Sequence, residues 1–189
     1  MQNDVIMAGF GGQGILLIGK MLAYAGMHEG KEVSWLPSYG PEMRGGTCNC
    51  TVVISDKPVG SPVIQSPGAV LAMNLPSLEK FESDVRPGGF LLINTSLIER
   101  KAERDDVKIV EIPANTIAQD LGNTRGANMV ALGAYVGATG AVSLEQIEAV
   151  VRQTFAAKPS LIDVNLEVLH KGYDLGREHA APTAEEAAS

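Results

Sequence analysis

A glycine-rich turn, Gly9-Phe10-Gly11-Gly12-Gln13-Gly14, interrupts the apolar run Val5-Ile6-Met7-Ala8 just before a second apolar segment begins at Ile15. Glycine adopts backbone angles that a side chain forbids, so the main chain can turn sharply here and approach a ligand closely. A helix that starts at Gly14 would direct its unpaired N–H groups and positive dipole end at the turn. The pattern predicts a strand, a tight turn and a helix, with either an anion site at the turn or a turn that binds nothing.

Strand and helix patterns then alternate along the chain. The helix from Ile15 should end near Gly30, which suits a left-handed cap, and Glu32 to Leu36 has the pattern of a second strand. Only the ten residues 37–46 connect it to the alternating segment Thr47 to Ile54. That connection is too short for a helical crossover, so we expect these two strands to be antiparallel and the sheet to be mixed. Further patterns predict strands at 68–73, 90–94 and 107–112, and helices at 75–85, 114–121, 127–138, after the cap Ser143, and at 160–175.

These elements predict an α/β fold, a Rossmann-like three-layer mixed sheet with helices on both faces. At 189 residues one domain is the expectation, with residues 1–176 folded and the small, acidic segment 177–189 a flexible tail. The weakly charged stretch 126–144 has the composition of a buried Gly/Ala-rich helix, and no membrane span is expected. With two cysteines and no leader pattern, we expect a reduced, cytoplasmic setting.

Several chemistries lack their defining residues. The net charge of −7, without a basic stripe, argues against nucleic acid. Gly9 and Gly14 have the spacing of a phosphate-binding P-loop, but Ile15-Leu16 replace its Lys and Ser/Thr, which argues against NTP hydrolysis. An NAD site needs an acidic residue at the end of the second strand, where Ser34-Trp35-Leu36-Pro37 stands instead.

Cysteine and histidine residues give no catalytic or metal site. Cys48 and Cys50 supply two ligands where a structural zinc or iron–sulfur centre needs about four, so they are predicted to be reduced thiols packed in a strand. His28, His170 and His179 are scattered and lack a nucleophilic partner at a recognisable turn. We expect no metal and no catalytic residue on this chain.

A second turn-rich segment, Pro37 to Gly46, is predicted to be a loop. Loops after parallel strands open on the same carboxyl edge of a sheet, so this loop is expected near the glycine turn. Tyr39, Glu42 and Arg44 would then offer an aromatic face, an acceptor and a bidentate donor for a phosphate or carboxylate. The alternative is that Glu42 and Arg44 simply pair across the loop.

Taken together, Gly9 to Gly14 and Ser38 to Gly46 resemble the gamma subunit or domain of 2-oxoacid:ferredoxin oxidoreductases. The resemblance continues through Ser55-Asp56-Lys57-Pro58 and Asn128 to Ala134, and covers about residues 4 to 156. Such enzymes oxidatively decarboxylate a 2-oxoacid on thiamine diphosphate, pass electrons through iron–sulfur clusters and transfer the acyl group to coenzyme A. The variant Gly45 to Cys50 looks more like the 2-oxoglutarate and branched-chain members than the pyruvate members.

The resemblance implies that this chain binds no cofactor alone and is inactive alone. Thiamine diphosphate is expected on the alpha and beta subunits, and the clusters on the beta or a ferredoxin-like delta subunit. The implied role is assembly and the coenzyme A side of the active site. The residues implied to contact coenzyme A or a neighbouring subunit are Gly9, Gly11, Gly12, Gln13 and Gly14, with Tyr39, Glu42 and Arg44 opposite. The alternatives are a clamp between subunits at Ser38 to Gly46, a purely structural assembly subunit, and a free-standing NAD- or FAD-binding enzyme.

Overall fold

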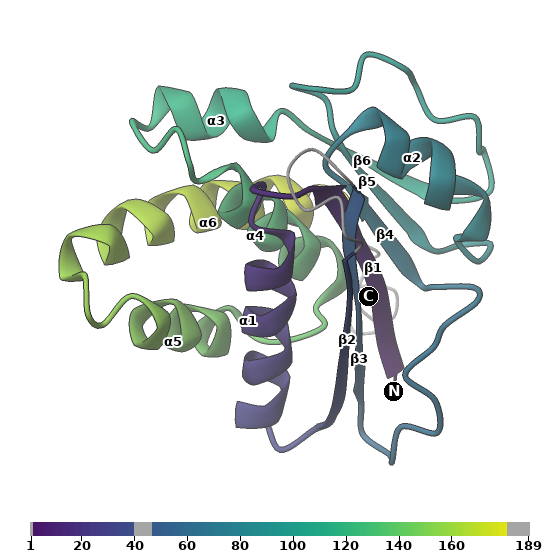
Figure 1. The fold of residues 1–189 in the computed structure, drawn as a ribbon, viewed down its shortest axis with the longest axis horizontal. Coiled ribbons are helices and arrows are strands. Elements are labelled where there is room, and N and C mark those ends of the chain that lie inside the picture. Colours follow the sequence, from purple (N-terminus) through teal and green to yellow (C-terminus); the bar gives the residue numbers. More distant parts are fainter. Residues whose placement is uncertain (1, 40–46, 181–189) are drawn as a thin grey trace, which may run out of the picture.

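A computed structural model describes residues 2–39 and 47–180 of the chain. Within those ranges, six strands form one sheet in the order β2-β3-β1-β4-β5-β6 (Figure 1). The neighbours β1, β4, β5 and β6 are parallel, whereas β3 is antiparallel to both β1 and β2. The predicted mixed sheet is confirmed. The strands are β1 Gln2–Phe10, β2 Glu32–Tyr39, β3 Thr47–Ser55, β4 Ala69–Ala72, β5 Phe90–Asn94 and β6 Lys108–Ile112.

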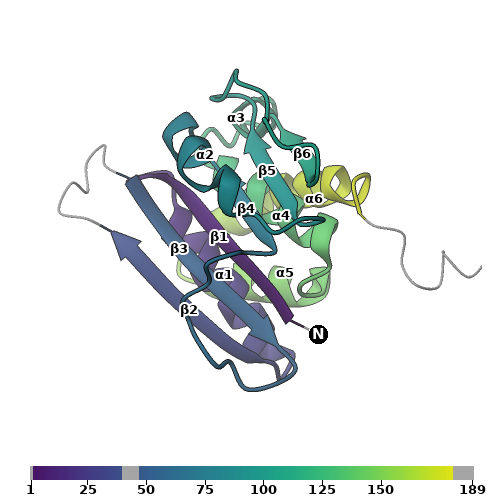
Figure 2. The same ribbon diagram turned by 90° about the vertical axis from the view of Figure 1, so that its right-hand side faces the viewer.

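Helices cover both faces of the sheet, as predicted, but unequally. The helices α1, α4, α5 and α6 stack on one face, and α2 covers the other face beside β4 and β5 (Figures 1 and 2). The larger hydrophobic core lies under α1 and α4, and a smaller one joins Ile6, Val70 and Leu91 to Leu78 of α2. The helices are α1 Ile15–His28, α2 Leu75–Phe81 with the 3-10 turn η1 Glu82–Asp84, α3 Ala114–Asp120, α4 Ala127–Thr139, α5 Leu144–Thr154, the turn η2 Pro159–Leu161 and α6 Ile162–Arg177.

The second strand is longer than its sequence pattern indicated. We predicted that β2 ends at Leu36 and that Pro37 begins a loop, but Pro37, Ser38 and Tyr39 still pair with β3. The sheet tolerates a proline at position 37 because β2 is an edge strand, where a missing N–H costs no ladder hydrogen bond. The strand period therefore continues through a residue that usually signals a turn.

The pair α4 and α6 packs through glycines. Added Cβ atoms at Gly133 and Gly137 of α4 would collide with the carbonyl oxygens of Leu169 and Tyr173. In the same way, Cβ atoms added to the glycines of α6 would collide with the backbone of α4. The backbones touch because no side chain separates them, which leaves α4 buried along nearly its whole length. This confirms the predicted buried Gly/Ala-rich helix. Among the described residues, no helix has both the length and the apolar character to cross a membrane.

The N-terminus of α5 is tied to the end of α1. The Ser143 hydroxyl accepts the Gln146 N–H at 3.4 Å, which confirms the predicted cap. In a complete capping box, the side chain of Gln146 would accept the N–H of Ser143. Here that N–H donates instead to Glu29 Oε1, at 2.6 Å, so the acceptor comes from the end of α1. Lys31 Nζ lies 2.7 Å from Glu29 Oε2 and donates to the carbonyl of Ala141 at 3.1 Å. The two turns are therefore held together by charge-assisted hydrogen bonds.

The helix α6 ends at Arg177, one residue past the predicted end of the domain. The domain boundary and the flexible tail stay predictions, because residues 181–189 lie outside the described ranges.

Candidate functional site

The glycine turn has the backbone geometry that its sequence predicted. Gly12 and Gly14 have φ angles of 96° and 73°, in the left-handed region that favours glycine. The N–H of Gln13 donates to the carbonyl of Phe10 at 3.1 Å and closes the turn, and α1 begins at Ile15. Among the described residues, no side chain caps the first turn of α1, and its N–H groups face the turn.

Gly9 and Gly14 also avoid collisions with side chains. A Cβ at Gly9 would lie 2.6 Å from Gln13 Oε1, and a Cβ at Gly14 would collide with Asn128 Nδ2. Asn128 stands in the first turn of α4 and donates to the carbonyl of Gly14 at 3.4 Å. The starts of α1 and α4 are therefore joined at the turn.

The side chain of Gln13 turns back into the protein. Its Oε1 accepts the N–H of Phe10 at 2.6 Å and Asn74 Nδ2 at 3.3 Å, while its Nε2 donates to the carbonyl of Met73 at 3.3 Å. Both ends of the amide are thus engaged with β1 and the segment after β4. We predicted Gln13 to contact coenzyme A or a subunit, and that contact stays a prediction. The geometry supports a positioning role, since this amide holds the turn against β4.

Asparagines continue this arrangement along the carboxyl edge of the sheet. Asn74 Oδ1 accepts the N–H of Ser77 at 2.9 Å and so caps α2. Asn94, the last residue of β5, donates to Asn115 Oδ1 at 2.8 Å and accepts the N–H of Ala114 at 3.2 Å. We did not single out Asn74 or Asn94 from the sequence. An asparagine just after a short apolar strand was the available signal, because such residues favour caps and turns.

The second predicted loop begins at the same edge as the glycine turn. Both β1 and β2 are antiparallel to β3, with Phe10 opposite Thr47 and Tyr39 opposite Cys48. The strands that precede the two loops therefore end at one edge of the sheet, as expected, and residues 40–46 lie outside the described residues. Tyr39 is the last residue of β2, and Glu42 and Arg44 lie outside the described residues. Their contacts with a ligand or a subunit stay predictions.

The cysteines are structural in character. Burial raises the pKa of Cys50 to about 12, while the neighbouring indole of Trp35 opposes this effect. Burial also raises the pKa of the half-buried Cys48. High thiol pKa values suppress the thiolate that metals and electrophiles require. Within the described ranges, no three Cys, His, Asp or Glu side chains gather as a metal site.

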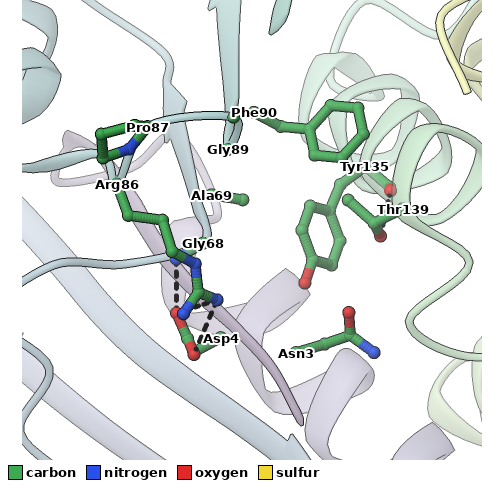
Figure 3. Close-up of a pocket in the computed structure, with 11 residues that line it drawn as sticks. Asn3, Asp4, Gly68, Ala69, Arg86, Pro87, Gly89, Phe90, Tyr135 and Thr139 are labelled. Atoms are coloured by element: carbon green, nitrogen blue, oxygen red, sulfur yellow. Dashed lines mark hydrogen bonds and ion pairs between the residues drawn. The ribbon is translucent and has the colours of Figure 1, made fainter. Parts of the chain in front are cut away.

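A polar cavity of about 210 Å³ lies at the opposite edge of the sheet (Figure 3). There Arg86 pairs with the buried carboxylate of Asp4 at 3.3 Å, and the N–H of Gly68 also donates to that carboxylate. The ring of Tyr135 directs its hydroxyl toward Asn3 and Asp4, and burial raises its pKa (Figure 3). Asp4 and Phe10 are separated by about 20 Å of extended strand, so this cavity is not part of the glycine-turn site.

The fold and the site together define a Rossmann-like α/β protein whose carboxyl edge carries an amide-braced glycine turn. The family described as pyruvate ferredoxin/flavodoxin oxidoreductase matches residues 4–175, and the chain belongs to that family. This confirms the family resemblance carried by the two glycine-rich segments.

Three similar proteins place the chain within that family. The ketoisovalerate oxidoreductase subunit VorA of Methanothermobacter marburgensis is 42% identical over 93% of this chain, which spans only 37% of that relative. A keto/oxoacid ferredoxin oxidoreductase gamma subunit from Geobacter sulfurreducens is 31% identical, with a TM-score of 0.80 over 93% of this chain and 99% of that one. The 2-oxoglutarate:ferredoxin oxidoreductase of Magnetococcus marinus, solved with 2-oxoglutarate, coenzyme A and succinyl-CoA, is 25% identical, with a TM-score of 0.88 over 96% of this chain and 32% of that one.

Proposed function

We propose that this chain is the gamma subunit of a multi-subunit 2-oxoacid:ferredoxin oxidoreductase and that its carboxyl edge lies on the coenzyme A side of the active site. The observation that carries the proposal is the glycine turn braced by Gln13 at that edge. The brace holds the Gly11-Gly12 backbone in one position, as a site that receives a ligand through backbone N–H groups requires. The coenzyme A and succinyl-CoA bound by the Magnetococcus relative support this ligand class.

The chemistry of the edge suits coenzyme A. The unpaired N–H groups at the start of α1 favour its phosphates, since a helix N-terminus carries partial positive charge. Three exposed apolar side chains lie at the carboxyl ends of three neighbouring parallel strands, namely Phe10 as the last residue of β1, Leu75 after β4 and Leu97 after β5. They offer apolar contact to the pantetheine arm or to a neighbouring subunit.

The complete reaction needs groups that we assign to other subunits. A 2-oxoacid loses CO2, its acyl group goes to the sulfur of coenzyme A, and two electrons go to ferredoxin. We assign thiamine diphosphate to alpha and beta subunits and the iron–sulfur clusters to beta or delta subunits. We propose 2-oxoglutarate as the substrate and cytoplasm as the location. The name of the VorA relative favours a branched-chain 2-oxoacid instead, and turnover of the purified complex with both acids decides between them.

Kinetics of an Arg44→Ala variant in the assembled complex test the coenzyme A role. If Arg44 holds coenzyme A, the KM of the variant complex for coenzyme A should rise about tenfold or more, while its KM for the 2-oxoacid stays unchanged. If the segment 38–46 is instead a clamp between subunits, Arg44→Ala should reduce co-purification and leave the KM for coenzyme A unchanged in the complex that remains.

Two other functions remain distinguishable by experiment. A purely structural subunit predicts that the complex without this chain is active and merely less stable. A free-standing NAD or FAD enzyme predicts micromolar binding of either cofactor to the isolated chain by calorimetry, and such binding would overturn the gamma-subunit proposal. Family membership and the lack of an acidic residue in the second half of β2, from Trp35 to Tyr39, both argue against this last function.

A further inference from the structure

The helix α1 carries a second apolar stripe that faces away from its own core. Its inner face buries Ile15, Ile18 and Leu22. On the outer face, Leu17, Tyr24 and Met27 are 37%, 41% and 57% exposed. A globular helix normally pairs one apolar stripe with a polar opposite face, so a helix that is apolar on both sides is typical of one buried on both sides. Within the described residues, no segment buries this outer stripe as the core buries the inner one.

The outer stripe borders a hollow. A cavity of about 510 Å³ lies between α1 and the end of α5, which contact each other on the helical side of the sheet (Figure 1). Gln153 and Thr154 of α5 form its far wall. Its α1 wall is formed by Leu17, Lys20, Met21, Tyr24, Met27 and His28. The volume of this groove is sufficient for several side chains of an incoming segment, and α1 contributes apolar side chains to its lining.

The charged residues that line the groove indicate which kind of partner it can bind. Lys20 and His28 line it, and no Asp or Glu is among its lining residues, although the whole chain has a net charge of −7. Lys20 Nζ lies 5.5 Å from the centroid of the Tyr24 ring, at the centre of the stripe. A second copy of this chain on a two-fold axis would bring the Lys20 ammonium groups of both copies to the same interface. A segment with apolar and acidic side chains complements both properties of the groove.

We propose that this groove binds an amphipathic, acidic segment of a neighbouring subunit, namely the polypeptide that is continuous with this unit in the longer relatives. The chain spans 37% of the VorA relative and 32% of the Magnetococcus chain, so each of them attaches a larger polypeptide to this unit. The Geobacter gamma subunit, in contrast, is matched over 99% of its length. In a complex of separate chains, the contact must form without a covalent link. This inference rests on the proposed function, since it requires a multi-subunit complex.

Photo-crosslinking in the purified complex tests the proposal. A p-benzoylphenylalanine residue is placed at Met27 of the tagged full-length chain, the complex is isolated from its native cell and irradiated, and the joined peptide is identified by mass spectrometry. The expected product joins position 27 to an apolar, acidic peptide of the subunit homologous to the remainder of the longer relatives. The matched control carries the same group at Val63, which is 62% exposed in the segment before β4 and should not join that peptide.

A charge-reversal variant tests the docking proposal independently. Lys20→Glu should lower the yield of co-purified subunit about tenfold relative to Lys171→Glu, which reverses an exposed lysine on α6. Far-UV circular dichroism of both variants excludes unfolding as the cause. Crosslinks to a second copy, to no protein in an intact complex, or equal yields of the two variants overturn the docking groove but leave the gamma-subunit assignment standing. A purified assembly without any 2-oxoacid oxidoreductase subunit overturns both.

Discussion

At the scale of single residues, the side chain of Gln13 makes three hydrogen bonds at the candidate site. Its side-chain amide forms hydrogen bonds with Phe10, Met73 and Asn74, and these link the turn to the end of the neighbouring parallel strand β4. We expect Gln13→Ala to lower the free energy of unfolding by about 2 kcal/mol, because it removes three hydrogen bonds, two of which are part-buried. Urea unfolding measures the change.

The control for this variant is Gln65→Ala, which shortens an exposed glutamine in the loop before β4. It should change the free energy of unfolding by less than about 0.5 kcal/mol. Equal stability of Gln13→Ala and Gln65→Ala would show that the turn holds its shape without the amide, and the positioning role of Gln13 would be wrong.

Sequence reasoning placed Gln13 at the candidate site as a contact for coenzyme A or a subunit, but it did not anticipate the internal hydrogen bonds of this side chain. Its position within the glycine turn was readable, because glycines at 12 and 14 demand a turn there. Its partners Met73 and Asn74 follow some sixty residues later, and no local pattern pairs them with it. The side chain of Gln13 therefore serves the scaffold, whatever the backbone of the glycine turn beside it contacts.

At the scale of elements, the contact of α4 with α6 depends on the absence of side chains. We expect Gly133→Ala to lower the free energy of unfolding by about 3 kcal/mol, because its Cβ collides with the backbone of α6 at Leu169, and a helix backbone cannot move aside as a side chain can. Thermal unfolding detects the change as a lower Tm.

Gly60→Ala is the matched control for Gly133→Ala. Its Cβ would meet no atom within 4 Å, and its φ angle lies outside the left-handed region. The same chemical change should therefore be nearly neutral or slightly stabilising there. If the two variants unfold at the same temperature, the helices can separate at little cost and the close packing is not a constraint on the sequence.

The junction of α1 with α5 should depend on pH through Glu29. Burial acts to raise the pKa of this carboxyl, but hydrogen bonds from Lys31 and Ser143 outweigh it and hold the pKa below the ordinary 4.5. Because the folded pKa lies below the unfolded one, this stabilisation is complete above about pH 4.5 and is lost as the pH falls through the folded pKa.

Glu29→Gln should therefore lower the free energy of unfolding by about 1 kcal/mol near neutral pH, and the difference from the parent protein should shrink below about pH 4. Urea unfolding across this pH range measures it. Glu167→Gln, at an exposed position on α6, is the control and should show no such pH dependence. A constant difference across the pH range would mean that Glu29 contributes by packing rather than by its charge.

At the scale of the whole molecule, the alternation of strands and helices was predictable because each period is a local property. The short connection at 37–46 correctly required an antiparallel β3, and the mixed sheet followed from it. The length of β2 was not predictable in the same way, because Pro37 is tolerated only at an edge strand, and strand order is a tertiary property. The asparagines at the carboxyl edge were missed for the same reason, since Asn74 and Asn94 gain meaning only where β1, β4 and β5 lie side by side.

The whole chain should unfold as one unit although its core has two parts. The two hydrophobic clusters lie on opposite faces of the same sheet, and β1, β4 and β5 contribute side chains to at least one cluster each. Neither cluster can be exposed without disrupting strands that support the other. Trp35 is the single tryptophan, and it packs against the larger cluster from the edge strand β2. Its fluorescence therefore reports the end of the sheet farthest from β6.

We expect urea transitions followed by Trp35 fluorescence and by far-UV circular dichroism to share one midpoint. Proteins of this size often depart from two-state behaviour, so coincidence is a demanding outcome. An earlier fluorescence midpoint would show that β2 and β3 separate from the parallel strands first, and the sheet would then consist of two cooperative units. Coincident transitions would mean that the glycine turn, the α1 groove and the strands beneath them persist together, so that a variant in either site reports on contacts made in the complex rather than on local unfolding.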